Sequence, residues 1–414
     1  MDDRLRLQRL LRDNCTQEPE DAIGHLLALL NKENGPWPFG DLIRSYQSLW
    51  KGLPVAVRDG SDSEWNTTID LLKLRLKHFA PHMENPLHHK SLRPALNNTE
   101  ANQEISHAVL HEFVKHFDLG LACSASRKPR VMVILPNSPL LALAVLAVAN
   151  RYTLVPMAKA VTAEQLKMDI KAVEADAVLM LEADVPKFRI ESEIATFIVK
   201  PQDNLIFRVS RWADASSSTI ARLRPNGPDD LAVILFTSGT SGTKKLVPIT
   251  TFNLLASIIF TMDSLGLQDT SSCLNMMPLH HVGGMVRSLW APVFAGGTTI
   301  CCPTFDPSFF WDAVEKWCPT WYYATPTMHH MILAEAENCQ ECVHKSSIKF
   351  ICNAGGGLPP TLAEQLHSTS GCVVLPSYGM TECAPIAAPP LDYDLTRVGA
   401  SGLPAGPDLA ILDI

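Results

Sequence analysis

A loop of small hydroxyl residues, glycines and lysines follows an apolar run near the middle of the chain. Residues 232–236 read Ala-Val-Ile-Leu-Phe, which predicts a buried strand, and residues 237–245 read Thr-Ser-Gly-Thr-Ser-Gly-Thr-Lys-Lys. Glycine lets the main chain approach a ligand, so backbone N–H groups and hydroxyls can surround phosphate oxygens. Lys245 would add a positive charge where negative charge develops during nucleotidyl transfer. A surface loop without a ligand is the alternative for this segment taken alone.

Two better-known catalytic loops do not fit this segment. The P-loop of nucleotide triphosphatases ends in Gly-Lys-Ser or Gly-Lys-Thr, whereas here the lysines follow Thr243. The Gly-x-Ser-x-Gly elbow of α/β-hydrolases is also absent from it. The sequence therefore favours a phosphate-binding loop of another type.

A second chemical segment, residues 378–382, reads Tyr-Gly-Met-Thr-Glu and follows an expected strand at 373–375. The ring of Tyr378 can stack on a purine, and the hydroxyl of Thr381 can bond a phosphate oxygen. Glu382 can supply a hard oxygen ligand to Mg²⁺. The alternative is an ordinary helix start, where Thr and Glu are common.

Two further loops carry glycines and histidines. Residues 354–359 read Ala-Gly-Gly-Gly-Leu-Pro after the expected strand 350–352, and residues 277–284 read Met-Pro-Leu-His-His-Val-Gly-Gly. A glycine-rich main chain can line a ligand pocket, although an unliganded turn is the alternative. A histidine such as His281 can bond a substrate group as neutral or charged imidazole, or can be a hydrogen-bonded part of the core.

Together these four segments resemble the motifs of the adenylate-forming superfamily, which contains acyl-CoA synthetases, luciferases and nonribosomal peptide synthetase adenylation domains. The chain departs from the family pattern at five positions: Ser241 replaces threonine, Lys244 and Gly357 replace prolines, Leu246 replaces glycine, and His280 replaces an aromatic residue. The four motifs occur in family order and at family spacing, and the resemblance covers about residues 102–414.

The resemblance implies a role for each matching residue. Catalytic roles fall on Lys245, Thr381, Glu382 and His281, with Glu382 as the metal ligand and His281 beside the acyl pocket, where it would bond the carboxylate or gate the thiol channel. Nucleotide binding falls on Thr237, Ser238, Gly239, Thr240, Ser241, Gly242, Gly355, Gly356, Gly357, Tyr378, Gly379, Met380 and Thr381. Substrate binding falls on His281, Gly283, Gly284, Asn353 and Ala354.

The resemblance also implies the reaction. ATP and Mg²⁺ would serve to join a carboxylic acid to AMP with release of pyrophosphate, and the acyl group would pass to coenzyme A or to the phosphopantetheine of a carrier-protein domain. Family members that select α-amino acids usually carry an aspartate near the histidine motif, but this chain has no acidic residue between Leu274 and Phe294. We therefore expect an acid without an α-amino group, of the fatty, aryl, keto or hydroxy type.

Short β-branched runs alternate with helical segments from about residue 105 onward, which predicts an α/β fold with mostly parallel sheets flanked by helices. In such sheets ligands bind at the carboxyl ends of strands. The resemblance adds a smaller, distorted β subdomain. The expected strands are 131–135, 153–156, 177–181, 196–199, 232–236, 298–302, 321–324, 350–352 and 373–375, and a helix is expected at 140–150.

We expect two parts in the chain: a helical extension with an irregular insertion over residues 1–100, and the AMP-binding large domain over residues 101–414. The insertion, 61–98, is polar and interrupted by prolines. The final residues, 402–414, resemble a strand entry that the family continues into a mobile C-terminal domain carrying a catalytic lysine. We therefore expect a chain cut from a longer protein.

Composition limits the other classes of function. The net charge is −8, so a nucleic-acid partner is not expected. The charged residues 1–10 do not have the pattern of a signal peptide, so none is expected there, and the longest apolar run, 140–149, is too short to span a membrane. Eleven scattered cysteines indicate reduced thiols and a cytoplasmic, or at least intracellular, location. A metal site at Cys339, Cys342 and His344 is disfavoured because no second ligand pair follows at suitable spacing.

Two other functions remain as alternatives to the adenylating enzyme. One is a nucleotide- or acyl-adenylate-binding module without turnover. The other is an ordinary ATPase, which the lysine positions disfavour. The enzyme hypothesis requires that Lys245 and Glu382 converge on one bound ATP.

Overall fold

The computed structural model describes residues 92–100, 103–123, 127–191, 193–202, 205–212, 223–238, 244–353, 355–397 and 399–406. The chain divides into two compact units, residues 1–81 and 82–414, and all described residues belong to the second. The helices expected before residue 91 and most of the 61–98 insertion lie outside the described residues.

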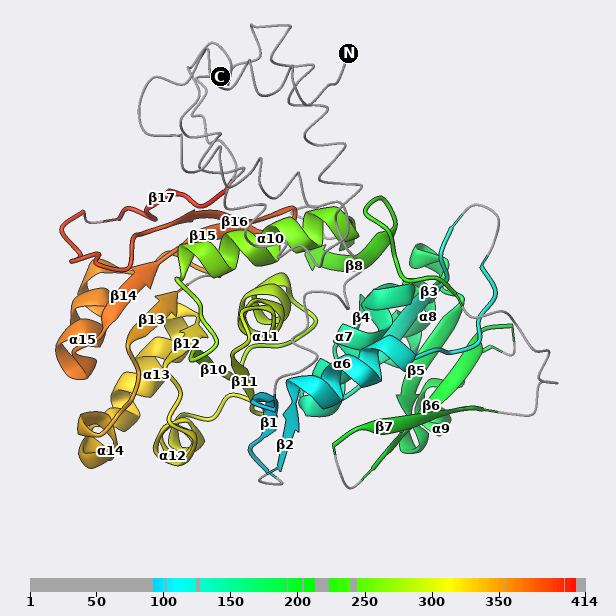
Figure 1. The fold of residues 1–414 in the computed structure, drawn as a ribbon, viewed down its shortest axis with the longest axis horizontal. Helices are drawn as coiled ribbons and strands as arrows, with labels where there is room; N and C mark the ends of the chain where they lie inside the picture. The colour runs from blue at the N-terminus through cyan, green and yellow to red at the C-terminus, as the bar shows by residue number, and fades with distance from the viewer. Residues whose placement is uncertain are drawn as a thin grey trace, which may run out of the picture. The chain divides into compact units, whose positions relative to one another are not determined.

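The first sheet has seven strands. Their spatial order is β7 (Phe207–Arg211), β6 (Ala195–Pro201), β5 (Ala177–Leu181), β3 (Arg130–Ile134), β4 (Thr153–Pro156), β8 (Leu231–Ser238) and β9 (Lys244–Thr250). The five inner strands run parallel, and the edge strands β7 and β9 are antiparallel to their neighbours. Figure 1 shows this sheet on the right.

Helices cover both faces of the first sheet. The short η1 (Glu182–Asp184) leads into α9 (Val185–Phe188), which packs with α8 (Ala163–Val173) on one face, over an apolar core that includes Ile134 and Ile234. Helix α7 (Pro139–Arg151) contacts β3, β4 and β8, but contributes no residue to that core cluster. Nearly every residue of α7 is buried, which explains the long apolar run at 140–149 as core packing.

The second sheet also has seven strands. Their order is β14 (Val373–Pro376), β13 (Phe350–Asn353), β12 (Trp321–Ala324), β10 (Ser272–Asn275), β11 (Thr298–Cys301), β1 (Pro94–Asn98) and β2 (Gln103–Ser106), and only β2 is antiparallel. The second sheet is on the left in Figure 1. Strand β1 corrects the expectation of an irregular segment at its residues: a buried Ala95-Leu96 pair outweighs the strand-breaking Pro94, because β1 pairs with β2 and β11 on either side. The division at residue 100 stays a prediction.

Helices again form layers on the second sheet. One core joins the sheet to α12 (Pro307–Trp317), α13 (Pro326–Ala336), α14 (Gln340–His344) and α15 (Pro360–Ser370). The π-helix η2 (Gly283–Trp290) continues into α11 (Ala291–Phe294) and contacts β10 and β12, while α6 (His107–His116) follows β2. No helix in the described part of the chain is long and apolar enough to cross a bilayer.

A small antiparallel sheet completes the fold, as the resemblance implied. It consists of β15 (Tyr378–Met380), β16 (Cys383–Ala388) and β17 (Leu403–Pro404). Helix α10 (Thr251–Ser264) follows β9 and contacts β8, β9, β16 and η2. Helix α10 therefore contacts the first and third sheets directly and reaches the second sheet through η2, and it lies along the upper edge of the described fold in Figure 1.

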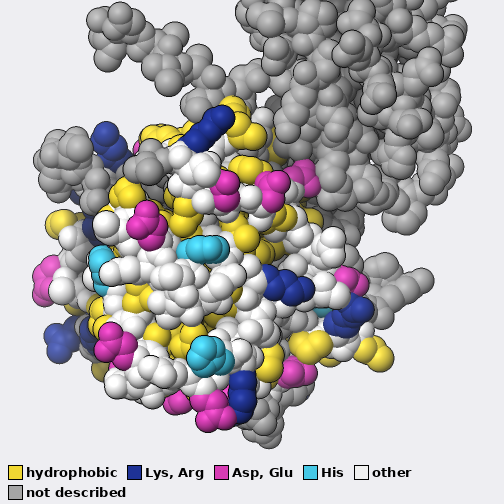
Figure 2. Space-filling view, turned by 90° about the vertical axis from the view of Figure 1, so that its left-hand side faces the viewer, with side chains coloured by type: hydrophobic (Ala, Val, Ile, Leu, Met, Phe, Trp, Pro, Cys, Tyr) yellow, Lys and Arg dark blue, Asp and Glu magenta, His cyan; other side chains and the backbone are white. Residues whose placement is uncertain are grey.

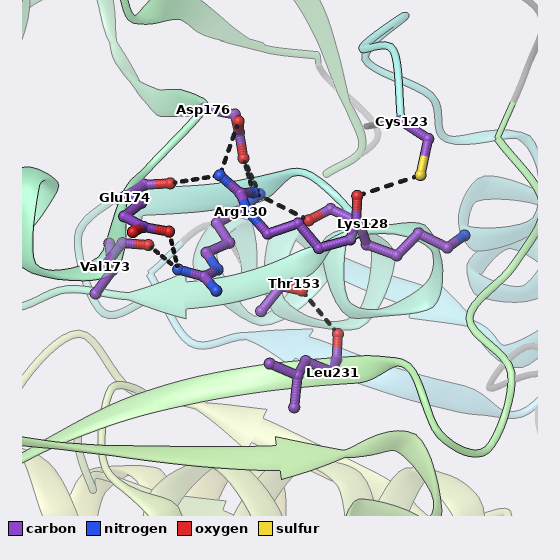
Figure 3. A network of polar contacts seen from close by, with 9 residues as sticks. Cys123, Lys128, Arg130, Thr153, Val173, Glu174, Asp176 and Leu231 are labelled. Atoms are coloured by element: carbon purple, nitrogen blue, oxygen red, sulfur yellow. Dashed lines mark hydrogen bonds and ion pairs between the residues drawn. The ribbon is translucent and has the colours of Figure 1, made fainter. Parts of the chain in front are cut away.

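Charged side chains hold the amino-terminal ends of strands in the first sheet (Figure 3). Asp176, which precedes β5, accepts bonds from the Arg127 guanidinium at 2.5 Å and from the Arg130 backbone N–H at 2.7 Å. The Arg130 guanidinium donates to the Val173 carbonyl at 2.7 Å. These contacts belong to the edge opposite the strand ends where the candidate site lies.

Candidate functional site

Three of the four predicted segments follow parallel strands of the second sheet, namely β10, β13 and β14. Strands β12, β13 and β14 end in register at Ala324, Asn353 and Pro376, and β10 ends beside β12. Because the strands run parallel, the loops at 277–284, 355–357 and 378–382 emerge at the same edge of the sheet. The structure thus brings together segments that are about a hundred residues apart in the sequence.

The carboxyl edges of the two large sheets meet at Asn137. This residue follows β3 of the first sheet, and its Oδ1 accepts a bond from the Leu279 N–H at 3.1 Å. Its Nδ2 donates to the carbonyls of Met277 at 3.4 Å and Cys302 at 3.3 Å. Strand β8 runs parallel to β3 in the same sheet, so Thr237 at the end of β8 lies on the same edge as Asn137. This edge faces residues 277–284, which we call the histidine loop.

The loop after β13 is held by Asn353, which is 1% exposed. Its Nδ2 donates to the Gly356 carbonyl at 3.0 Å, and its backbone carbonyl accepts from the Ser377 hydroxyl at 2.7 Å. Its Oδ1 has no hydrogen-bond partner among the described residues. Gly355 has φ +77°, a conformation that favours glycine. Ala354 lies outside the described residues, whereas Gly356 and Gly357 are exposed.

Strand β15 presents its residues to solvent. The Tyr378 side chain is 51% exposed, Gly379 and Met380 are also exposed, and Thr381 is half-buried. A large ring that is left exposed at the end of a parallel sheet is available to stack on a planar ligand. Stacking of Tyr378 on adenine stays a prediction.

Glu382 is the residue expected to hold Mg²⁺. It is exposed and forms no ion pair with any cation in the described part of the chain. The described residues contain no group of three or more His, Cys, Asp or Glu side chains arranged to hold a metal. A single accessible carboxylate can supply one ligand to Mg²⁺. Phosphate oxygens of the nucleotide and water molecules would supply the other ligands.

The histidine loop carries two neighbouring rings. The centroids of His280 and His281 are 4.4 Å apart. Burial, aided by the charge of His281, lowers the pKa of His280 to about 4, and burial also lowers the pKa of His281. Both imidazoles are therefore neutral at pH 7, so each can donate from one ring nitrogen and accept at the other.

Packing requires both glycines that follow the histidines. A Cβ on Gly284 would lie 2.3 Å from the Pro278 carbonyl oxygen, and one on Gly283 would lie 2.5 Å from the Tyr323 hydroxyl. These contacts give Gly283 and Gly284 a structural role, and their role in substrate binding stays a prediction.

The two ends of the first predicted segment pair with each other, at the end of β8 and the start of β9. In its register Thr237 pairs with Lys245 and Ser238 with Lys244. The residues between them, Gly239, Thr240, Ser241, Gly242 and Thr243, lie outside the described residues. Adjacent residues of a strand point to opposite faces of the sheet, so the side chains of Lys244 and Lys245 lie on opposite faces.

The two lysines differ in their surroundings. The Lys244 ammonium lies 2.7 Å from the Asp169 carboxylate of α8 and over the Phe236 ring. Lys245 is exposed, forms no ion pair with a described residue, and shares the opposite face with Thr237. Helix α10 contacts β8, β9 and also β16, which follows Glu382. The convergence of Lys245 and Glu382 on one ATP is compatible with this arrangement and stays a prediction.

Sequence reasoning missed Arg287, a buried cation in η2. It is 7% exposed, and its Nη1 donates to the Ser377 hydroxyl and to the Cys352 sulfur at 3.0 Å. Its guanidinium carbon lies 5.2 Å from the centroid of the Tyr323 ring. The sequence did carry a signal for this residue, because Arg287 is the single charged residue in the otherwise mostly apolar segment 284–290.

Two cavities lie away from these residues. One, of about 750 Å³, is lined by α8 and α9 residues such as Leu166 and Phe188. The other, of about 420 Å³, lies between α13, α14 and α15 and includes His330 and His344. Figure 2 shows the side of the molecule that carries α14 and α15, where acidic and basic side chains are interspersed with apolar ones. Neither cavity includes a predicted site residue.

The chain is similar in sequence to known proteins. The family model described as AMP-binding enzyme matches residues 84–414. "Probable CoA ligase CCL9" of Humulus lupulus is 32% identical over 324 residues, 75% of this chain and 61% of that protein. "Oxalate--CoA ligase" of Arabidopsis thaliana is 30% identical over 325 residues, 75% of this chain and 62% of that protein. The chain therefore spans less than two thirds of these relatives.

Solved structures share the fold. O-succinylbenzoate coenzyme A synthetase (MenE) from Bacillus subtilis, in complex with AMP, superposes with a TM-score of 0.64 at 23% identity, over 78% of this chain and 64% of that chain. The expected architecture, mostly parallel sheets flanked by helices with a smaller β subdomain, is confirmed, and the structure contains two such large sheets and a small third one.

Proposed function

Because the chain belongs to the AMP-binding enzyme family, we propose that it forms the ATP- and acid-binding part of an acid–thiol ligase. The proposed reaction adenylates a carboxylic acid without an α-amino group and releases pyrophosphate. The acyl group then passes to the thiol of coenzyme A, an acceptor favoured over a carrier-protein pantetheine because the relatives are named CoA ligases.

The first step needs charge neutralisation more than acid–base chemistry. A carboxylate oxygen attacks the α-phosphorus, the bond to the bridging oxygen breaks, and pyrophosphate leaves with that electron pair. The hydroxyls of Thr237 and Ser238, the loop that follows them, and Lys245 would bind the phosphate oxygens. Mg²⁺ held at Glu382 would offset part of the phosphate charge.

The second sheet would hold the other parts of the substrates. Tyr378 and the main chain of 355–357 would frame the adenine, and Thr381 would bond the α-phosphate. The neutral imidazole of His281 would bond the acyl carboxylate or guard the path of the thiol. In the second step the thiolate attacks the acyl carbon and AMP leaves with its phosphate oxygen.

The observation that carries the proposal is the contact between the two carboxyl edges. Asn137 of the first sheet bonds the backbone at Met277 and Leu279 of the second. This contact holds the carboxyl edge of the first sheet, at the end of β3, against the loop that follows β10, which supports a ligand bound by both sheets.

Pyrophosphate exchange in the full-length polypeptide tests the proposal. We expect label to return from pyrophosphate into ATP only when a suitable carboxylic acid is present. Tight nucleotide binding without exchange for any acid would instead support the non-catalytic module. Phosphate release that does not depend on an acid would indicate an ATPase. Thermal stabilisation of residues 1–414 by ATP gives an independent measure of nucleotide binding.

A further inference from the structure

Arg287 places a positive charge beneath the predicted ligand segments. It projects from η2, the helix that begins at Gly283 within the histidine loop, and it bonds Cys352 near the end of β13 and Ser377 after β14. Ser377 precedes Tyr378, and Cys352 precedes Asn353. The guanidinium therefore lies next to the residues expected to hold the adenosine and acyl groups.

The charge of this guanidinium has no acidic partner in the described part of the chain. The guanidinium contacts the Cys352 thiol, the Ser377 hydroxyl and the Tyr323 ring, and burial raises the pKa of Tyr323, which keeps that phenol neutral. The nearby His280 and His281 are neutral as well, since burial lowers the pKa of each. A buried charge is costly unless an opposite charge accompanies it, so this site is suited to an anion supplied by a ligand.

We propose that Arg287 binds a second carboxylate of the acid substrate, which makes the preferred acid a short dicarboxylic acid. This inference rests on the proposed function and deepens it. Arg287 bonds Ser377, the residue directly before Tyr378, which is expected to stack on the adenine. A carboxylate bound by Arg287 would therefore lie close to the adenylate, so the acyl chain between the two carboxyl groups must be short.

The reacting carboxylate is a poorer partner for this arginine. That group loses its negative charge when it joins AMP, so a strong cation beside it would stabilise the ground state over the transition state. A second carboxylate keeps its charge throughout both steps. An acid without it would leave the guanidinium buried and without a counter-charge, which provides selection against monocarboxylic acids.

Stable acyl-adenylate mimics test the proposal by equilibrium binding to residues 1–414. The probes are paired acyl-sulfamoyl adenosines of increasing chain length, identical except that one ends in a carboxylate and the other in a neutral carboxamide. In the wild-type protein we expect the carboxylate probe to bind about 30-fold or more tightly than its carboxamide partner at one chain length at least.

Variants assign that preference to Arg287. Arg287→Gln should bring the ratio of the two dissociation constants to about 1, and Arg287→Lys should restore part of the ratio, because lysine keeps the charge and loses the fork geometry. Arg208→Gln, the same change at an exposed position in β7, should keep the wild-type ratio.

The outcomes separate this inference from the proposed function. Equal binding of the paired probes by the wild-type protein, at every chain length, would overturn the role of Arg287 and leave the adenylating function standing, even if the variants fail to fold. A preference that persists in Arg287→Gln would also overturn it. Failure of both probes and of ATP to bind would overturn the proposed function and this inference together.

Discussion

Lys244 and Asp169 form an ion pair that joins the start of β9 to α8. The Lys244 Nζ lies 2.7 Å from the Asp169 Oδ2, and Gln165 donates to Oδ1 of the same carboxylate at 2.8 Å. The Asp169 side chain is almost fully buried, whereas Lys244 keeps part of its surface in solvent. The adjacent Lys245 points to the other face. One lysine thus anchors the end of the loop and the other is available to a ligand.

The ion pair between Lys244 and Asp169 should contribute to the stability of the fold. Lys244→Met should lower the free energy of unfolding by about 1–3 kcal/mol, because it leaves the buried Asp169 carboxylate without its cation. Urea unfolding measures the change. The matched variant Lys245→Met removes an exposed lysine with no ion pair to a described residue and should change stability by no more than about 0.5 kcal/mol. Equal losses in the two variants would contradict this division.

The second prediction concerns function at the neighbouring position. In the full-length polypeptide, Lys245→Met should reduce the rate of pyrophosphate exchange by roughly tenfold to a thousandfold, since under the proposed function it removes the positive charge that binds the transferring phosphates. Lys349→Met serves as the control, because Lys349 is exposed before the amino end of β13, opposite the site. An unchanged exchange rate in Lys245→Met would remove this lysine from the phosphate site.

The third prediction tests the close approach of the histidine loop. Gly284→Ala would put a Cβ 2.3 Å from the Pro278 carbonyl oxygen, so we expect a loss of about 2–4 kcal/mol in unfolding free energy. Gly357→Ala meets nothing within 4 Å and should cost no more than about 0.5 kcal/mol. Denaturant unfolding of both variants decides the point, and a tolerated Gly284→Ala would show that the loop can shift.

The fourth prediction concerns pH. Burial lowers the pKa of His329 to about 4, with the charge of His330 as a smaller cause, and the Tyr322 hydroxyl lies 3.3 Å from its Nδ1. The unfolded chain, with a pKa near 6.5, binds the proton first, so the stability from neutral His329 is full above pH 6.5 and is lost as the pH falls toward 4.

Between pH 7 and pH 5 the wild-type protein should therefore lose about 2 kcal/mol more stability than His329→Gln. Urea unfolding at both pH values measures the difference. The exposed His344→Gln should keep the wild-type pH dependence. The same pH dependence in all three proteins would show that buried His329 accepts a proton without cost.

Much of the fold could be predicted from local patterns. The strands at 153–156, 177–181 and 321–324 have the expected bounds, because short apolar runs between helical segments leave few other ways to bury them. Strand β1 was missed because its residues include Pro94 and two asparagines, which disfavour strands locally. Its pairing with β11, about 200 residues away, decides its conformation.

The sequence by itself determined the four motifs that resemble those of the family and the parallel α/β architecture, because short-range residue types and periodicity carry that information. Only the tertiary structure decided that Lys244 pairs with Asp169, that Asn137 joins the carboxyl edges of two sheets, and that Arg287 is buried without an acidic partner in the described part of the chain. The reason is physical: burial and charge pairing depend on residues brought together from distant segments, and no local pattern in the sequence records which ones meet.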